Sequence, residues 1–258
     1  MRIWILAIAI TLGAALYQRI TGPTFPVLGH TRIGTHNVHY RLARSHGGPG
    51  DQTITIKAPD TRLGGELLWR LYPGDDPFTR APMRRQGLYL QGDLPHQPVA
   101  GKIEYKILLT DGTQAAEIPP GRTIVTRFKG AVPLWILILH IITMSLGMLF
   151  ANRAGLEALQ KQPNLLPPSR YSLALLTIGG LVLGPIVQKY AFDYYWSGVP
   201  FGWDLTDNKT LIASVAWLPA VFLIRKRSQR RVAVLAAAIL TLVVFLIPHS
   251  LFGSELKR

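Results

Sequence analysis

Apolar residues in this chain fall into long uninterrupted blocks towards both ends and into short alternating runs between them. The first block covers residues 3–17 and follows the basic residue Arg2. A spanning helix needs about 20 residues, and an apolar segment this close to the amino terminus is typical of a membrane anchor or a signal peptide. We interpret residues 1–19 as an N-terminal transmembrane anchor, with cleavage at the small residues 13–15 as the alternative.

Residues 20–130 have no helical period and alternate apolar with polar positions, separated by turn residues. In the clearest run, residues 102–109, four apolar side chains lie on one face and three charged ones on the other, as in a half-buried antiparallel strand. Seven or eight such strands in about 110 residues indicate a two-sheet sandwich. The stretch from Pro82 to Gly112 resembles the central hairpins of immunoglobulin-like or fibronectin-III-like domains, which implies this fold for the domain.

Four further apolar blocks follow residue 130, and each approaches the length needed to cross a membrane. They predict spans at about residues 132–151, 171–188, 209–224 and 232–248, within a helical domain of residues 131–258. The expected fold class is a membrane α-helical bundle of five transmembrane helices plus an all-β periplasmic immunoglobulin-like sandwich.

A basic cluster sets the expected orientation. Residues 225–231 carry five positive charges in seven residues, and such clusters stay on the cytoplasmic side. Alternation then places the N-terminus in the cytoplasm, and it places the sandwich and the C-terminus in the periplasm. The expected location is the bacterial inner (plasma) membrane.

The composition agrees with a membrane protein. Hydrophobic residues make up 48% of the 258 residues and charged residues 16%, which is too apolar for a soluble chain of this length. The absence of cysteine excludes disulfides, thiolate metal sites and covalently attached c-type haem. The net charge of +14 lies largely beside the apolar helices, so we expect a lipid bilayer and no nucleic acid as a partner.

The segment between the third and fourth predicted spans is rich in aromatic residues, and such residues prefer the membrane boundary. Polar residues gather at the outer helix ends around it. Asp207 precedes an apolar helix where an N-cap belongs, whereas Asp204 is left to bind a cation or a lysine. We expect Asp204 or Asp207 to lie within hydrogen-bonding reach of His249 or Lys189, with the start of the fourth span beside the end of the fifth. The candidate cluster consists of Gln188, Lys189, Asp204, Asp207, Lys209 and His249.

Two features lie inside the predicted spans. His140 is about two turns deep in the second span, and an ionisable residue there is a functional candidate. The alternative is a neutral histidine that hydrogen-bonds to a neighbouring helix. Gly180 and Gly184 have the GxxxG spacing that lets helices approach closely. We expect this pair to serve packing within the chain, with a subunit contact as the alternative.

Four histidines of the predicted sandwich raise the question of a metal site. His36 and His39 lie three residues apart on a predicted strand, so their side chains face opposite sides and do not share a metal without a bulge. Exposed or capping roles are expected for the set, and the metal content stays unknown. The four residues are His30, His36, His39 and His46.

Several segments together are similar to a family of bacterial inner-membrane proteins with a periplasmic immunoglobulin-like domain and no assigned activity. They are residues 21–23, 128–133, 184–190, 200–209 and 247–250, and the similarity extends over nearly the whole chain. It implies the architecture and a bacterial origin, and no catalytic residue is carried over from it.

The sequence favours a non-enzymatic membrane subunit or scaffold that presents its β domain to a membrane or periplasmic protein partner. No catalytic residue and no cofactor are predicted, because no nucleophile–base order, metal-ligand spacing or phosphate loop is present. The alternative is a redox subunit that binds b-type haem or quinol through His140 and His249. A transporter component is a weaker alternative, because few charges lie within the spans.

Overall fold

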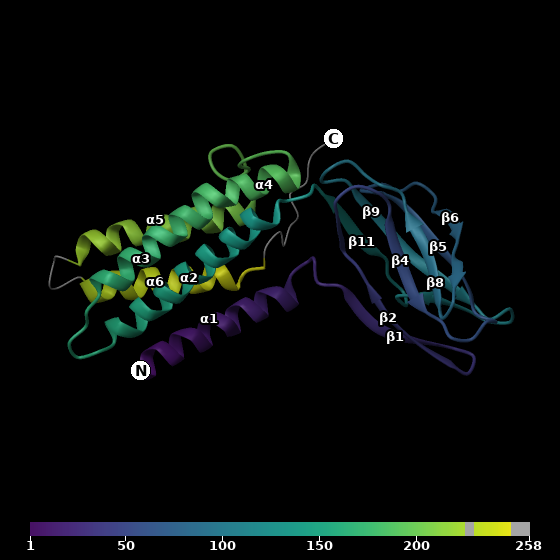
Figure 1. The fold of residues 1–258 in the computed structure, drawn as a ribbon, viewed down its shortest axis with the longest axis horizontal. Coiled ribbons are helices and arrows are strands. Elements are labelled where there is room, and N and C mark those ends of the chain that lie inside the picture. The colour runs from purple at the N-terminus through teal and green to yellow at the C-terminus, as the bar shows by residue number, and fades with distance from the viewer. Residues whose placement is uncertain (225–229, 249–258) are drawn as a thin grey trace. The chain divides into compact units, whose positions relative to one another are not determined.

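The computed structural model describes residues 1–224 and 230–248. The chain divides into two compact units, drawn in Figure 1: a helical unit that joins Met1–Pro23 to Val132–Arg258, and a β unit, Thr24–Ala131. His249, the C-terminus and residues 225–229 of the basic cluster lie outside the described residues, so the predictions made for them stay predictions.

The helical unit begins with α1 and resumes after the β unit. A π-helical segment, η1, ends two residues before Pro185, which has no N–H to donate to the preceding turn. The element bounds are α1 (Arg2–Thr21), α2 (Leu134–Ala158), α3 (Leu166–Leu176), η1 (Thr177–Leu183), α4 (Gly184–Phe192), α5 (Leu205–Leu223) and α6 (Arg230–Leu246).

The prediction of five transmembrane helices plus an immunoglobulin-like sandwich is wrong. Among the described helices, three are long and apolar enough to cross a membrane: α1, α2 and the continuous helix Leu166–Phe192. The first turn of α5 is polar from Thr206 to Lys209, which shortens its apolar part, and α6 has only 17 residues. Five spans were predicted because each apolar block was counted as one span, although the fourth block follows a polar helix turn and the fifth is short.

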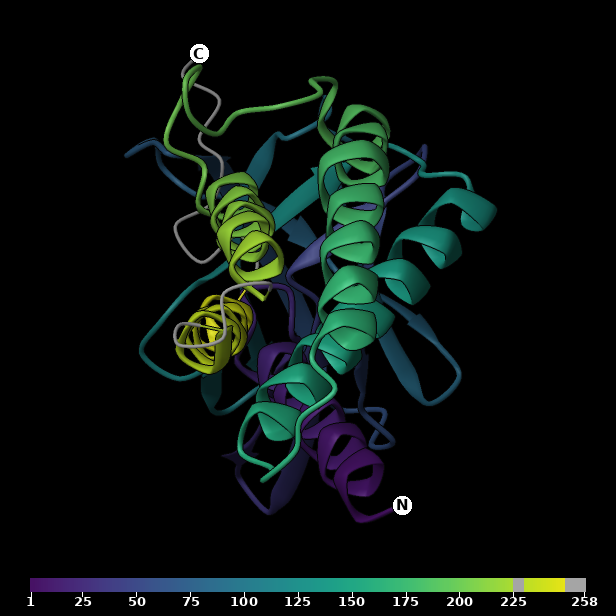
Figure 2. The same cartoon turned by 90° about the vertical axis from the view of Figure 1, so that its left-hand side faces the viewer.

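Small residues bring the helices of this unit close together. A Cβ on Gly147 would lie 2.9 Å from a methyl carbon of Leu176, and one on Gly180 would lie 2.0 Å from Cγ2 of Thr210. The expectation that Gly180 serves packing within the chain is therefore confirmed. Figure 2 shows α5 and α6 next to each other, and the buried Trp217 donates its Nε1–H to Thr241 Oγ1 at 2.9 Å between them.

Strands of the β unit form three sheets. One is the hairpin β1–β2, the second has the order β4–β8–β7, and the third has the order β3–β11–β9–β5–β6 with β10 paired to β9. All the pairs are antiparallel except β3 with β11. The bounds are β1 (Val27–Ile33), β2 (His36–Leu42), β3 (Ser45–Gly47), β4 (Gln52–Lys57), β5 (Gly64–Tyr72), β6 (Thr79–Pro82), β7 (Arg84–Gln86), β8 (Tyr89–Leu94), β9 (Lys102–Thr110), β10 (Ala115–Ile118) and β11 (Ile124–Lys129).

Side chains from all three sheets share one hydrophobic core. The alternation predicted for residues 102–109 is confirmed, because Ile103, Tyr105, Ile107 and Leu109 are all fully buried. The Tyr105 hydroxyl donates to Ala43 O at 2.7 Å, and burial raises the pKa of this phenol. The arrangement as a whole corrects the two-sheet prediction, since eleven strands form three sheets.

Candidate functional site: the loop anchored on Asp207

The carboxylate of Asp207 anchors the loop between α4 and α5. Asp207 lies in the first turn of α5 and is only 6% exposed. Its Oδ2 accepts hydrogen bonds from Ser197 N (2.6 Å), Ser197 Oγ (3.1 Å), Gly198 N (3.1 Å) and Gln188 Nε2 (3.2 Å). One oxygen therefore joins α4, the loop and the start of α5.

Asp204, and not Asp207, is the N-cap of α5. Its Oδ1 accepts from Thr206 N at 2.8 Å and from Asp207 N at 3.2 Å. The cap was expected at Asp207, but α5 begins at Leu205, four residues before the span predicted from residue 209, so the residue in the N-cap position is Asp204. A carboxylate at this position stabilises the positive end of the helix dipole.

Further hydrogen bonds make the loop a compact turn. Asn208 Oδ1 accepts from Val199 N at 2.8 Å, and Gly198 O accepts from the amides of Phe201 (2.9 Å) and Gly202 (3.0 Å). A Cβ on Gly202 would lie 2.5 Å from Ser197 O, so glycine is required for this close approach. The backbone of the loop is thus held from several directions.

The same loop carries large aromatic side chains that are exposed to solvent. Phe201 is 83% exposed and Trp203 is 87% exposed, and Tyr195 is also exposed. Such side chains combine a large apolar surface with, for Trp and Tyr, a polar atom that suits an interface. An anchored backbone that carries exposed aromatics is suited to contact a bilayer surface or another protein.

Neither lysine of the predicted cluster bonds to Asp204 or Asp207. Lys189 Nζ donates to Asp193 Oδ1 at 2.8 Å and to Asp193 O at 3.1 Å, so the predicted contact with Lys189 is wrong. Lys209 is 4% exposed and its Nζ donates to Ile247 O at 2.6 Å. This bond confirms that the start of the fourth predicted span lies beside the end of the fifth.

Burial shifts the proton affinity of both buried groups of the cluster, which lie in α5 outside the three long apolar helices. Burial raises the pKa of the Asp207 carboxyl, and the hydrogen bonds from Ser197 and Gln188 partly offset this effect. Burial lowers the pKa of Lys209 to about 8, and the nearby charge of Asp204 opposes the shift. Because donors surround Asp207 Oδ2, this carboxylate serves as an anchor and not as a free base.

His140 hydrogen-bonds to a neighbouring helix, which is the structural role considered for it in the sequence analysis. It lies on α2, and its Nδ1 donates to Gly179 O, a carbonyl of η1, at 2.9 Å. Because a carbonyl only accepts, Nδ1 carries the proton of this hydrogen bond. Hydrogen bonding to a neighbouring helix is thus confirmed. A pairing with His249 concerns a residue outside the described part of the chain.

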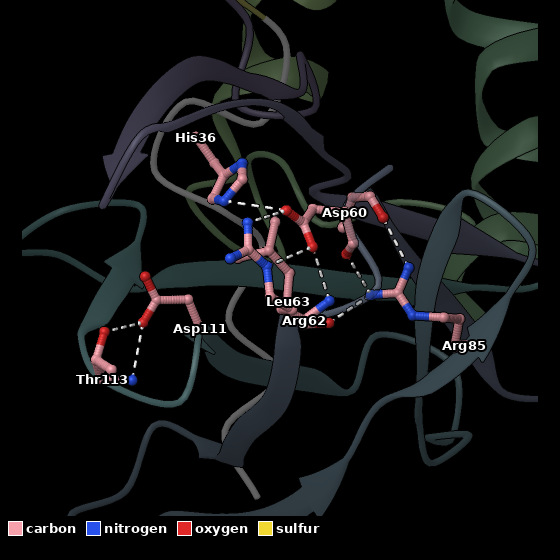
Figure 3. A network of polar contacts seen from close by, with 8 residues as sticks. His36, Asp60, Arg62, Leu63, Arg85, Asp111 and Thr113 are labelled. Carbon is pink, nitrogen blue, oxygen red and sulfur yellow. Dashed lines mark hydrogen bonds and ion pairs between the residues drawn. The ribbon is translucent and has the colours of Figure 1, made fainter.

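A second polar network, shown in Figure 3, lies in the β unit and was missed from the sequence. Asp60 accepts from Arg62 Nη2 at 2.8 Å, and its Oδ2 lies 3.2 Å from His36 Nε2. The hydrogen bonds from Arg62 hold the pKa of the Asp60 carboxyl below its usual range. His36, expected to be exposed or capping, therefore contacts a carboxylate.

Arg85 closes the same turn through main-chain oxygens. Its guanidinium donates to Ala58 O (2.7 Å), Asp60 O (3.0 Å) and Leu63 O. A planar fork of donors suits several carbonyls at once. The network therefore stabilises the connection between β4 and β5.

Within residues 1–224 and 230–248, no group of three or more acidic or histidine side chains is arranged to hold a metal ion. No protein-family model matches the chain, and no curated protein is significantly similar to it in sequence.

Proposed function

We propose that this chain is a non-enzymatic membrane subunit that presents its β unit and the loop of residues 193–204 to a protein partner. The observation that carries the proposal is the contrast within this loop. Its polar groups are used to hold the backbone on Asp207, while Phe201 and Trp203 point outwards. Exposed aromatics on a rigid support are typical of interface centres.

The proposed location is a bacterial inner membrane. Three long apolar helices support insertion in a bilayer. With the N-terminus in the cytoplasm, α1 carries the β unit to the periplasm. The helices α2 and Leu166–Phe192 then bring the loop of residues 193–204 to the same outer side.

Co-purification from native membranes tests the proposed partner. The full chain is solubilised in mild detergent after crosslinking, and bound proteins are identified by mass spectrometry. We expect Trp203→Ala and Phe201→Ala to reduce the captured partner at least about tenfold, as loss of an interface anchor does. The matched control is Trp135→Ala, which removes an exposed tryptophan from the spanning helix α2. A monodisperse chain without any partner contradicts the proposal.

A redox subunit is the second candidate, and the hydrogen bond of His140 is compatible with it. Histidines that bind metals commonly donate their other ring N–H to a carbonyl, as Nδ1 of His140 does to Gly179 O. The nitrogen Nε2 would then contact haem iron or a quinol. An absorption spectrum of the natively purified chain tests this candidate, and the absence of a Soret band and of extracted quinone removes it.

A further inference from the structure

The hairpin β1–β2 brings two histidines opposite each other. Its register runs without interruption from Val27 paired with Leu42 to Ile33 paired with His36, and it pairs His30 directly with His39. Both histidines lie on the exposed face, whereas Ile33, Val38, Tyr40 and Leu42, at alternate positions of the two strands, are buried in the core. The backbone beneath the pair is therefore fixed on both strands.

The separation of the rings fits one shared metal ion. Their centroids lie 5.8 Å apart, and their planes meet at 44°. A metal bound at about 2.0 Å from a ring nitrogen lies about 3.2 Å from the ring centre, so two rings on one ion are about 5.2 Å apart at the tetrahedral angle and about 6.4 Å apart when linear. The observed separation lies within this range.

Neither ring makes a hydrogen bond or an ion pair within the part of the chain that the structure describes. His36, on the same strand, is instead paired with Asp60. We propose that His30 and His39 form a two-imidazole site for a divalent transition-metal ion on the outer face of this hairpin. This inference is independent of the function proposed above.

The imidazole ligands indicate which metal ions the site prefers, and the nearby charges affect the binding affinity. Neutral imidazole suits zinc, copper and nickel, and hard ions such as magnesium prefer oxygen. Two protein ligands leave the remaining positions to water or to an incoming group. Arg41 lies on the same exposed face two residues after His39, and its charge opposes a cation. Arg32 is bonded to Gly34 O at 3.2 Å.

Zinc titration of the solubilised, chelator-treated full chain tests the site by calorimetry. We expect saturable binding at one zinc ion per chain, and a weakening of about tenfold or more in His30→Gln and in His39→Gln, since each removes one of two ligands. The control His46→Gln removes a histidine of the same unit that bonds to Gly50 O, and it should leave the affinity unchanged. Copper(II) should show two nitrogen couplings by electron paramagnetic resonance.

A charge variant provides a second readout that does not remove a ligand. Arg41→Gln should tighten zinc binding about two- to fivefold at low salt, because it removes a positive charge near the ion. Circular dichroism confirms that each variant is folded. No saturable zinc binding below about 1 mM, or equal binding by the His30→Gln, His39→Gln double variant, overturns the proposal.

Discussion

At the scale of single residues, Asp207 offers the clearest test of how the loop is held. Asp207→Ala removes the acceptor of four hydrogen bonds, and we expect a loss of about 2–3 kcal/mol in the free energy of unfolding, because buried donors are left unpaired. Asp207→Asn should lose less, since its carbonyl oxygen can take the place of Oδ2. Thermal unfolding in detergent and protease cleavage within residues 193–204 measure the effect.

The matched control is Asp193→Asn, which removes an exposed partner of Lys189. Exposed ion pairs contribute at most about 1 kcal/mol, so its unfolding temperature should stay close to that of the parent. Equal stability of Asp207→Ala and the parent would contradict the anchoring role.

Glu104 predicts a pH dependence of the β unit. Burial raises the pKa of this carboxyl, but the hydrogen bonds from Thr123 and Arg70 outweigh burial, so the pKa lies below its ordinary value. A carboxyl with a lowered pKa stabilises the fold above its unfolded pKa of about 4.3, and this contribution is lost as the pH falls through the folded pKa. Unfolding of the parent and of Glu104→Gln is compared between pH 7 and pH 3.

We expect the stability difference between these two chains to be largest at neutral pH and to shrink as the pH is lowered. Glu66→Gln is the control, because Glu66 contacts Arg80 at 3.4 Å on a more exposed edge. A pH-independent difference between parent and Glu104→Gln would show that ionisation of Glu104 does not contribute.

Sequence patterns found part of the candidate site at this scale. They placed Gln188 and Asp207 in one cluster, and the two side chains are hydrogen-bonded. They placed the N-cap at Asp207 and not at Asp204, because a helix begins at its capped polar turn and an apolar run marks only its later part. They missed Ser197, whose contribution depends on a turn ten residues before Asp207.

At the scale of helices, the glycines around η1 provide a matched pair of substitutions. A Cβ on Gly180 would lie 2.0 Å from Thr210 Cγ2, whereas one on Gly184 would meet its nearest atoms at 3.6 and 3.8 Å. We expect Gly180→Ala to destabilise the helical unit by about 1–3 kcal/mol through overpacking. Gly184→Ala should be neutral or stabilising by up to about 1 kcal/mol, since alanine favours helix. Thermal unfolding in detergent, with the parent as reference, separates the two.

Helices and strands were predicted correctly where the pattern of neighbouring residues determines them. The prediction failed where contacts between segments far apart in the chain determine the structure. The alternation in residues 102–109 identified the long strand β9. The parallel pairing of Ser45–Gly47 with Arg127–Lys129 joins segments that lie far apart in the chain, and no periodicity reports such a contact. The π-helical turn was also missed, because it changes the hydrogen bonds of a helix and not its apolar pattern.

At the scale of the whole molecule, cysteine labelling can test the proposed orientation in the membrane. The chain has no cysteine, so single cysteines are specific reporters. A membrane-impermeant maleimide should label Asp75→Cys, in the β unit, in intact cells with a permeable outer membrane. It should label Gln162→Cys, between α2 and α3, only after lysis. The reverse pattern, or equal labelling of both before lysis, contradicts the proposed orientation.

The π-helical segment Thr177–Leu183 also sets the angular phase of α4 relative to α3. Each residue of an α-helix turns the chain by about 100°. Deletion of one residue from this segment would therefore swing the side chains of α4 by more than a quarter turn about the helix axis. Gln188 would then face away from Asp207, and the outer loop would lose its link to the helix that precedes it. The length of this segment decides whether α4 and the loop that follows it keep their side chains aligned.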